Sequence, residues 1–244
     1  MKNILVVGDS CTDVYTYCKT SRLAPDKPIP VLEVINKVET PGMAFNVFNN
    51  ALAIGDPQST DLITNPNYKD VIKNRYVDKS SNHMFIRVDS STPIERIVSM
   101  SPEEEYETVI IADYDKGFLT TEDIEYICSN HPQVFLDTKK VLGSWASNAK
   151  FIKINNYEYE RSKEYVDHTL SSKIIKTMGS AGCSYDGKIY PVDKVDIMDV
   201  SGAGDTFMAS LCVKYTETED IISSIEYANE CAAKVVRKKG TTIL

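Results

Sequence analysis

The sequence has few histidines, no closely paired cysteines and no long apolar run, and each shortage removes a class of protein from consideration. Its three histidines, His83, His131 and His168, show none of the spacings that bind zinc. Its six cysteines are scattered without a C-x-x-C pair, which favours reduced, structural thiols in a cytoplasmic protein. The apolar run at residues 4–7 is too short for a signal peptide or a membrane span.

Positive charge is also scarce. The chain carries 27 Lys and Arg against 35 Asp and Glu, a net charge of -8, and its longest cationic run is the triplet at residues 237–239. This balance argues against a nucleic-acid or membrane partner and favours small molecules. With 244 residues, 42% hydrophobic and 25% charged, the composition is that of an ordinary globular protein, and we expect a single domain over residues 1–244.

The most informative stretch is Asp-Val-Ser-Gly-Ala-Gly-Asp at residues 199–205, which runs directly into an apolar segment of helical period. Gly202, Ala203 and Gly204 leave the backbone almost bare, so the N–H groups at the start of the helix can hold an anion. Asp205 would repel a bound phosphate unless it takes up a proton, and we interpret it as a general base for an attacking hydroxyl. The alternative is a glycine turn with an aspartate that merely begins a helix.

From residue 108 onward, short apolar runs alternate with helical segments. This alternation predicts βαβ units, and therefore a mostly parallel sheet with helices on both faces. A continuous apolar run near the start predicts a further strand that is buried on both faces. Strands are expected at residues 4–7, 109–112, 134–137, 151–154 and 174–177, helices at 41–55, 122–128, 140–149, 203–215 and 219–239, and a hairpin turn at Asp186-Gly187.

Two β-rich stretches, at residues 12–40 and 75–92, predict a small β lid beside the main sheet. Prolines at positions 25, 28 and 30 exclude helix from the first stretch and suit edge strands and turns. Within these stretches, the runs 30–35 and 82–89 are candidates to pair with each other. The exposed edges of such a sheet favour a homodimer formed through the lid.

Polar residues follow four successive strands of the predicted sheet. They lie at residues 113–117, 137–139, 155–158 and 177–179. Any one of them would be read as an ordinary polar loop. Because the carboxyl ends of parallel strands meet at one edge of a sheet, the four together favour a single ligand site.

Residues 199–205 resemble the D-T-x-G-A-G-D signature of the ribokinase-like (PfkB) carbohydrate kinases, with Val200 and Ser201 as variants. The N-terminal third resembles the heptose 7-phosphate kinase branch of that family, in Gly8-Asp9 and in residues 21–31 and 41–47. The resemblance implies an α/β, ribokinase-like fold with a central mostly parallel sheet and a β lid. It also implies that this fold is trimmed, because too little chain follows Gly55 for the usual strand-helix-strand unit.

The resemblance also implies roles for individual residues. In the family the early aspartate and the P-G-G-A-x-N-V segment line the sugar pocket, and Met43 stands where the second glycine is usual. Asp113 and Lys116 match a D-Y-x-K-G loop near sugar and phosphates, and we also assign Arg87 to the acceptor. The expected site is therefore Asp205 as the base, the N–H groups of Gly202, Ala203 and Gly204 around the transferred phosphoryl, and Asp13, Gly42, Asn46, Arg87, Asp113 and Lys116 at the acceptor.

The cofactors implied are ATP and Mg²⁺. Asn155 and Glu158 match the family's N-x-x-E motif, in which the glutamate holds Mg²⁺ through water. Thr177, Gly179 and Gly182 match a T-x-G-x-x-G turn beside the nucleotide, and Asn229 and Gly240 are expected to flank the adenine.

The expected function is that of an ATP-dependent sugar kinase whose acceptor is a sugar or sugar phosphate, with heptose 7-phosphate as one candidate. Two alternatives remain open at this point. One is a non-catalytic sugar- or nucleotide-binding protein of the same fold, which Met43 and the shortened sheet favour. The other is a fructose or nucleoside kinase, which differs only in the acceptor.

Overall fold

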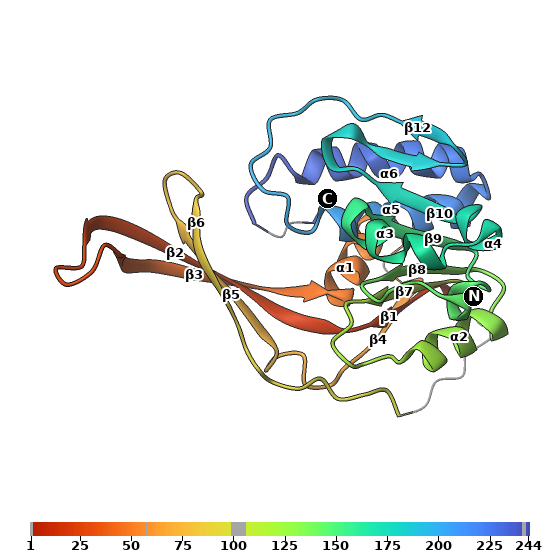
Figure 1. Ribbon diagram of the computed structural model, residues 1–244, viewed down its shortest axis with the longest axis horizontal. Helices are drawn as coiled ribbons and strands as arrows, with labels where there is room; N and C mark the ends of the chain where they lie inside the picture. The colour runs from red at the N-terminus through yellow and green to blue at the C-terminus, as the bar shows by residue number, and fades with distance from the viewer. Residues whose placement is uncertain (1, 57, 99–105, 241–242) are drawn as a thin grey trace.

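A computed structural model describes the chain except for residues 1, 57, 99–105 and 241–242. It has a main body built on one eight-stranded sheet, from which a four-stranded sheet projects (Figure 1). In spatial order the main sheet contains β12 (Lys188–Tyr190), β11 (Cys183–Tyr185), β10 (Ile174–Thr177), β9 (Phe151–Asn155), β8 (Val134–Thr138), β7 (Tyr106–Asp113), β1 (Lys2–Gly8) and β4 (Thr60–Thr64).

The main sheet is parallel from β10 to β4, and only the hairpin of β11 and β12 runs antiparallel. The hairpin turns at Asp186 and Gly187, whose φ angles of 48° and 70° are both positive. A two-residue turn with both φ angles positive matches the twist of the flanking strands, which is why Asp-Gly is favoured there. The predicted mostly parallel sheet and its hairpin are confirmed.

Helices cover both faces of the sheet. Successive residues of a strand point to opposite faces, so in β1 the side chain of Val6 packs with α1 (Ala44–Ile54), α5 (Ala203–Thr218) and α6 (Ile221–Val235). The neighbouring Leu5 and Val7 pack on the other side with α2 (Thr121–Asn130) and with Leu170 of the short helix α4 (His168–Ser171). Another short helix, α3 (Asn156–Ser162), follows β9. This two-sided burial explains the continuous apolar runs.

The helix predicted over residues 140–149 is wrong. The structure has only a 3-10 turn there, Ser144–Ala146, and two further 3-10 turns at Lys163–Tyr165 and Gly179–Ala181. The buried residues Leu142, Ala146 and Ala149 imitate helical spacing. Gly143, however, is extended with φ -160°, and the chain packs against the sheet as coil.

The projecting sheet is the predicted β lid, with strands in the order β3 (Pro30–Met43), β2 (Ser10–Leu23), β5 (Ile72–Asp78) and β6 (Met84–Asp89). The expected pairing of runs 30–35 and 82–89 is wrong, because these runs lie at opposite edges of the lid. β2 and β5 lie between them, and β5 runs parallel to β2. Its sequence, Ile-Lys-Asn-Arg-Tyr-Val-Asp, is too polar to stand out as a strand.

A single residue, Asp9, separates the core strand β1 from the lid strand β2. Its side chain is buried, and its Oδ2 accepts a hydrogen bond from the backbone N–H of Tyr114 at 2.7 Å. Its backbone carbonyl accepts from the N–H of Ala44, the first residue of α1, at 2.9 Å. The base of the lid is thus tied both to the loop after β7 and to the start of α1.

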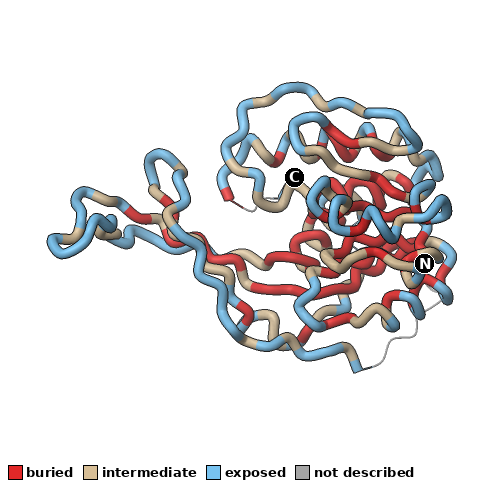
Figure 2. The backbone as a smooth tube through the Cα atoms, in the orientation of Figure 1, coloured by how far each residue is buried: buried red, intermediate tan, exposed pale blue. Residues whose placement is uncertain are grey.

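The outer part of the lid is exposed, whereas its base is buried against the body (Figure 2). Apolar side chains occur on this exposed part, at Leu23, Ile29, Val34, Ile35, Val38, Met84, Ile86 and Val88. The homodimer through the lid stays a prediction, and light scattering would measure it.

All six cysteines are buried free thiols. Within the described residues, no helix combines the length and apolar character needed to cross a bilayer.

Candidate active site

The turn at residues 199–205 starts α5, as its composition predicted. Gly202 precedes the helix with φ 81°, in the left-handed region that glycine adopts without a Cβ clash. Among the residues that the structure describes, no side chain caps this end of the helix. The N–H of Ala203 donates back to the carbonyl of Val200 at 3.3 Å. The first turn of α5 therefore has the bare backbone that an anion site requires.

Asp205 lies in this first turn, and its buried carboxylate has two hydrogen-bond donors. Oδ2 accepts from Nδ2 of Asn46, on α1, at 2.8 Å. Oδ1 accepts a short hydrogen bond from the hydroxyl of Tyr114, in the loop after β7. Asn50, one turn along α1, donates from its Nδ2 to the backbone carbonyl of Asn46 at 2.9 Å and to Oδ1 of Asn46 at 3.3 Å, and the second bond orients the Asn46 amide. Two residues predicted from separate motifs, Asp205 and Asn46, are thus in direct contact.

Burial dominates the electrostatics of Asp205 and raises the pKa of its carboxyl above the ordinary value. The hydrogen bonds from Asn46 and Tyr114 and the charge of Lys153 act in the opposite direction, while the neighbouring Asp137 raises the pKa further. Burial also raises the pKa of the Tyr114 phenol well above its ordinary value, so this hydroxyl remains a donor. A carboxylate with a raised pKa is suited to accept a proton near neutral pH.

A buried ammonium lies against the same helical turn. Lys153, on β9, places its Nζ 2.6 Å from Oδ2 of Asp137, at the end of β8. A Cβ added to Gly204 would lie 3.0 Å from that Nζ, so glycine at this position makes room for the lysine. Sequence reasoning missed Lys153, although one signal was present: a charged residue inside the apolar run 151–154.

A second lysine continues this charged network. Lys139 Nζ lies 2.7 Å from Oε1 of Glu158 and 3.4 Å from Oδ1 of Asp137. Burial alone would raise the pKa of Asp137, but the two lysines outweigh it and hold that pKa below its ordinary value. Their positive charges therefore stay close to the helical turn that carries Asp205.

The N-x-x-E motif forms a capping box at the start of α3. Asn155 Oδ1 accepts from the N–H of Glu158 at 2.9 Å, and Glu158 Oε2 accepts from the N–H of Asn155 at 2.8 Å. Because Lys139 binds the remaining oxygen, the Glu158 carboxylate has little room for direct metal ligation. The residues fit a magnesium ion that is held mainly by phosphate oxygens and water, as Mg²⁺ often is. The described residues contain no group of three or more His, Cys, Asp or Glu arranged around a metal.

The lid contributes Asp13, on β2, to the opposite side of the site. Its buried carboxylate pairs with the guanidinium of Arg75, on β5. A Cβ at Gly42 would lie 2.3 Å from Asp13 Oδ2, so glycine at position 42 allows this carboxylate to approach the backbone of β3. Arg75 begins the predicted β-rich stretch 75–92, but its role was missed because no sequence pattern pairs it with Asp13, 62 residues earlier in the chain.

Met43 occupies an unusual backbone conformation for its residue type. Its φ of 62° and ψ of -130° lie where glycine is strongly favoured. This conformation explains why the related family usually has glycine there. The Met43 side chain is buried, and its Sδ lies 2.9 Å from Nζ of Lys73.

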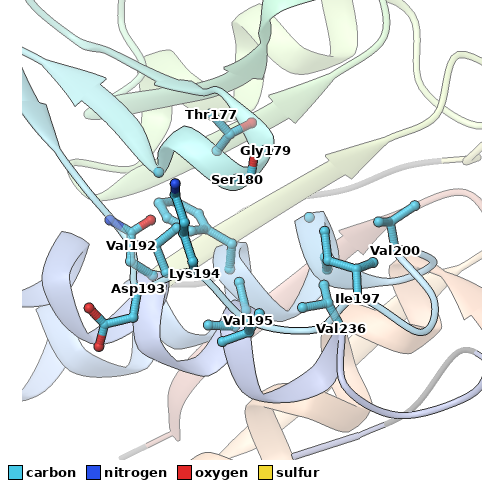
Figure 3. Close-up of a pocket in the computed structure, with 17 residues that line it drawn as sticks. Thr177, Gly179, Ser180, Val192, Asp193, Lys194, Val195, Ile197, Val200 and Val236 are labelled. Atoms are coloured by element: carbon cyan, nitrogen blue, oxygen red, sulfur yellow. The ribbon is translucent and has the colours of Figure 1, made fainter.

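A cavity of about 410 Å³ opens beside the first turn of α5 (Figure 3). Four predicted nucleotide residues line it, Thr177, Gly179, Gly182 and Asn229, together with Ala203 and Gly204. The remaining walls are mainly apolar, with Val192, Val195, Ile197, Val200, Phe207, Ala232, Ala233 and Val236. A flat apolar ring therefore fits in the cavity while a charged tail reaches the bare turn of α5.

Four predicted residues lie apart from these contacts. Gly240 donates its N–H to Asp199 at 3.1 Å and is not among the residues lining the cavity. Arg87 lies on the outer lid strand β6, exposed and paired with Asp89. Asp113 is buried against Thr138 and Lys140, and Lys116 is exposed on the loop after Tyr114. Their predicted roles remain predictions.

Comparison with known families decides the class of protein: residues 49–244 match the pfkB family carbohydrate kinases. The chain belongs to the PfkB family. The predicted family and the predicted enzyme class, a carbohydrate kinase, are thereby confirmed. The match begins within α1, so the assignments of Asp13, Gly42 and Asn46 in this PfkB kinase depend on the motif resemblance and on the contacts described above.

Curated relatives are consistent with this membership. The PfkB kinase is 28% identical to the Bifunctional protein HldE of Helicobacter pylori strain G27 over 300 aligned positions, and 27% identical to that of Campylobacter jejuni subsp. doylei over 288 positions. It spans 64% and 62% of these two relatives, which cover 100% and 98% of its own length. Because its 244 residues align over 300 positions, the first relative carries additional residues inside the match, in agreement with the predicted trimming.

Solved structures confirm the ribokinase-like fold. The nucleoside kinase of Methanocaldococcus jannaschii, an archaeal member of the ribokinase family, superposes with a TM-score of 0.72 at 17% identity, covering 99% of this chain and 93% of that one. The ribokinase of Thermotoga maritima gives 0.69 at 14% identity, with 99% and 95% covered. At these identities the likeness concerns the fold alone.

The hydrogen bond from Tyr114 leads to a prediction about pH dependence. Removing the hydroxyl in Tyr114→Phe takes away one of the two donors that lower the pKa of Asp205, while Asn46, Lys153 and Asp137 remain around it. Since a base works only above its pKa, we expect the acid limb of kcat/KM to move to higher pH by about one to two units, the value of one hydrogen bond to a charged group. A pH profile of the variant measures this.

The matched control for this profile is Tyr126→Phe, which alters an exposed tyrosine of α2 and should leave the limb unchanged. An acid limb that moves equally in both variants, or in neither, contradicts the assigned role of the Tyr114 hydroxyl.

Proposed function

We propose that this PfkB kinase transfers the γ-phosphoryl group of ATP to a hydroxyl of a sugar or sugar phosphate. One observation carries the proposal: Asp205, a buried carboxylate with a raised pKa, stands in the bare first turn of α5, which also borders the 410 Å³ cavity. The same turn is therefore suited to receive an acceptor hydroxyl on one side and a phosphate chain on the other.

The nucleotide end of the proposed site is the cavity. Its apolar walls suit the adenine ring, with Asn229 held at its side by a hydrogen bond to the carbonyl of Tyr190 at 3.0 Å. Thr177, Gly179 and Gly182 would line the path of the ribose and phosphates. Magnesium, held near Glu158 by water and phosphate oxygens, would neutralise charge on the phosphates when bound.

The acceptor end lies between the core and the lid. Asp13 and Asn46 offer a carboxylate and an amide to sugar hydroxyls, and both are buried. Asn46 also contacts Asp205, so a hydroxyl that binds beside this amide lies next to the base. We retain Gly42, Asp113, Lys116 and Arg87 as assigned residues of the acceptor end, and the contacts support Gly42 most directly.

The proposed chemistry requires little from the protein beyond position and charge. Asp205 takes the proton of the acceptor hydroxyl, whose oxygen forms the new bond to the γ-phosphorus as the bond to ADP breaks. The N–H groups at Gly202 and Gly204 and the ammonium of Lys153 face the charge that develops on the phosphoryl oxygens, whereas the N–H of Ala203, also assigned to this role, donates to the carbonyl of Val200 at 3.3 Å. The pair with Asp137, at 2.6 Å, holds that ammonium in place.

The finer proposal is that the acceptor is heptose 7-phosphate. The resemblance of the N-terminal motifs to the heptose 7-phosphate kinase branch supports it, and so does the similarity to proteins named HldE. A fructose or nucleoside acceptor remains the alternative within the same chemistry.

The test is a coupled assay of ADP release with Mg-ATP and a panel of sugars, nucleosides and sugar phosphates, followed by mass spectrometry of the products. We expect a product heavier by one phosphoryl group for at least one sugar or sugar phosphate. ATP binding by calorimetry with no turnover across the panel favours the non-catalytic alternative instead. Turnover confined to nucleosides or to fructose identifies the second alternative.

A further inference from the structure

Lys73 is a half-buried cation that forms no ion pair with any residue in the described ranges. It lies on the lid strand β5, directly across from Asp13 on β2. Within the described part of the chain, its Nζ contacts the Met43 thioether at 2.9 Å and lies 5.4 Å from the centre of the Tyr114 ring. A thioether sulfur is a weak acceptor and an aromatic face offers only partial charge, so neither neutralises the ammonium.

The neighbouring cations differ from Lys73 in this respect. Arg75 pairs with Asp13, and the three core lysines Lys139, Lys140 and Lys153 each lie within 3.0 Å of a carboxylate oxygen. Asp13, the carboxylate across from Lys73, is already engaged by Arg75. Asp89, which faces Lys73 from β6, pairs with Arg87 at 2.9 Å.

Lys73 also lies on the acceptor side of the catalytic base. The Tyr114 side chain connects the two, since its ring faces Lys73 while its hydroxyl donates to Asp205. The buried thiol of Cys11 lies among the same charges. Its pKa is raised to about 12 by burial and Asp13, against the opposing charges of Lys73 and Arg75. Asp13, Lys73 and Asp205 therefore surround one small region.

Met43 keeps the lysine in this region. The backbone conformation at position 43 favours glycine, which has no side chain, but this chain has methionine there. With glycine there, Nζ would lose its contact with Sδ and part of the apolar wall beside it. Met43, with its unusual backbone conformation, and the Lys73 ammonium that contacts it thus belong to one local arrangement.

We propose that Lys73 binds the phosphate ester of an acceptor sugar that already carries a phosphate. The inference rests on the proposed sugar kinase function and specifies its substrate class. Neutral hydroxyls are matched by Asp13 and Asn46, which accept and donate hydrogen bonds. A partly desolvated ammonium is matched by an anion, and lysine binds phosphate as a point charge. The anion of the acceptor lies at Lys73, and its reacting hydroxyl lies at Asp205 on the other side of Tyr114.

The test uses Lys73→Met, which keeps much of the side-chain length and removes the charge. Heptose 7-phosphate, fructose 6-phosphate and ribose 5-phosphate are each compared with the same sugar lacking its phosphate. We expect kcat/KM for the preferred phosphorylated acceptor to fall about 10- to 100-fold, the value of one charge-assisted hydrogen bond, with no matching loss for its unphosphorylated form. Lys69→Met, which removes an exposed charge just before β5, is the matched control and should change neither value.

Calorimetric binding of the same sugar phosphates distinguishes a failure of this inference from a failure of the proposed function. Tighter binding of a sugar phosphate by the wild type than by Lys73→Met supports the inference even if no acceptor is phosphorylated. Equal binding of the phosphates by both proteins, or an equal loss on phosphorylated and unphosphorylated acceptors, overturns it. Wild-type turnover of unphosphorylated sugars alone overturns it while leaving the kinase function in place.

Discussion

Asp205→Asn is expected to lower kcat by about 10²- to 10⁴-fold, the usual contribution of a general base. The amide has the shape of the carboxylate but cannot take up the acceptor proton. The free energy of unfolding should change little. Burial already raises the pKa of the Asp205 carboxyl, so the variant removes a charge that is unfavourable at this position. Initial-rate measurements with the acceptor identified in the panel give kcat, and calorimetry gives the affinity for ATP, which should stay close to that of the wild type.

Asp26→Asn provides the control for this experiment, because it makes the same chemical change at an exposed position of the lid. Its kcat should equal that of the wild type. Turnover by Asp205→Asn within a few-fold of the wild type would remove Asp205 from the role of base and leave it a residue that fixes Asn46 and Tyr114.

Asp137→Ala is expected to have the largest effect on stability, lowering the free energy of unfolding by about 3–5 kcal/mol. The variant leaves the Lys153 ammonium, whose side chain is only 5% exposed, without its carboxylate at 2.6 Å. It also removes one of the two carboxylates that Lys139 contacts. Breaking a buried pair costs far more than removing an exposed one, because an uncompensated charge stays inside.

The sign of the pH dependence follows from the lowered pKa of Asp137. A carboxyl whose pKa is lower in the folded than in the unfolded protein stabilises the fold above its unfolded pKa, near 3.9. That contribution is lost as the pH falls through the folded pKa. The difference between wild type and variant should thus be complete near neutral pH and shrink in acid below about pH 4.

Urea unfolding at several pH values measures this difference, with Glu160→Ala as the control. Glu160 pairs with Lys163 on the surface, with 62% and 53% of the side chains exposed, and its loss should cost about 0–1 kcal/mol. Similar losses in the two variants would mean that the Lys153–Asp137 pair contributes no more than a surface ion pair.

Much of the fold could be predicted because its main signals are local. Strands buried on both faces have uninterrupted apolar runs, as in residues 109–112. The dipeptide Asp186-Gly187 by itself predicts the hairpin turn that precedes β12. The exceptions are segments whose structure depends on distant partners. Residues 140–149 have helical spacing but pack as coil around Gly143, and β5 becomes a strand only because β2 and β6 flank it.

In the candidate site, too, the residues in local motifs could be predicted, and those whose roles depend on distant contacts could not. Asp205, Asn46 and the capping box of Asn155 and Glu158 lie in motifs that can be read from the sequence. The residues that set the charge of the site contact their partners from other elements: Tyr114 contacts Asp205, Lys153 contacts Asp137, and Arg75 contacts Asp13. The arrangement of such contacts follows from the sheet order, which no single motif specifies.

The position of Asp9 has a mechanical consequence. This residue joins the lid to the core and is bonded to both Tyr114 and the first residue of α1. A tilt of β2 relative to the core would therefore act on the backbone of Tyr114 and on the start of α1, the helix that carries Asn46. These two residues supply both donors to Asp205. Asp9 thus connects the base of the lid to the two elements that hold the Asp205 carboxylate.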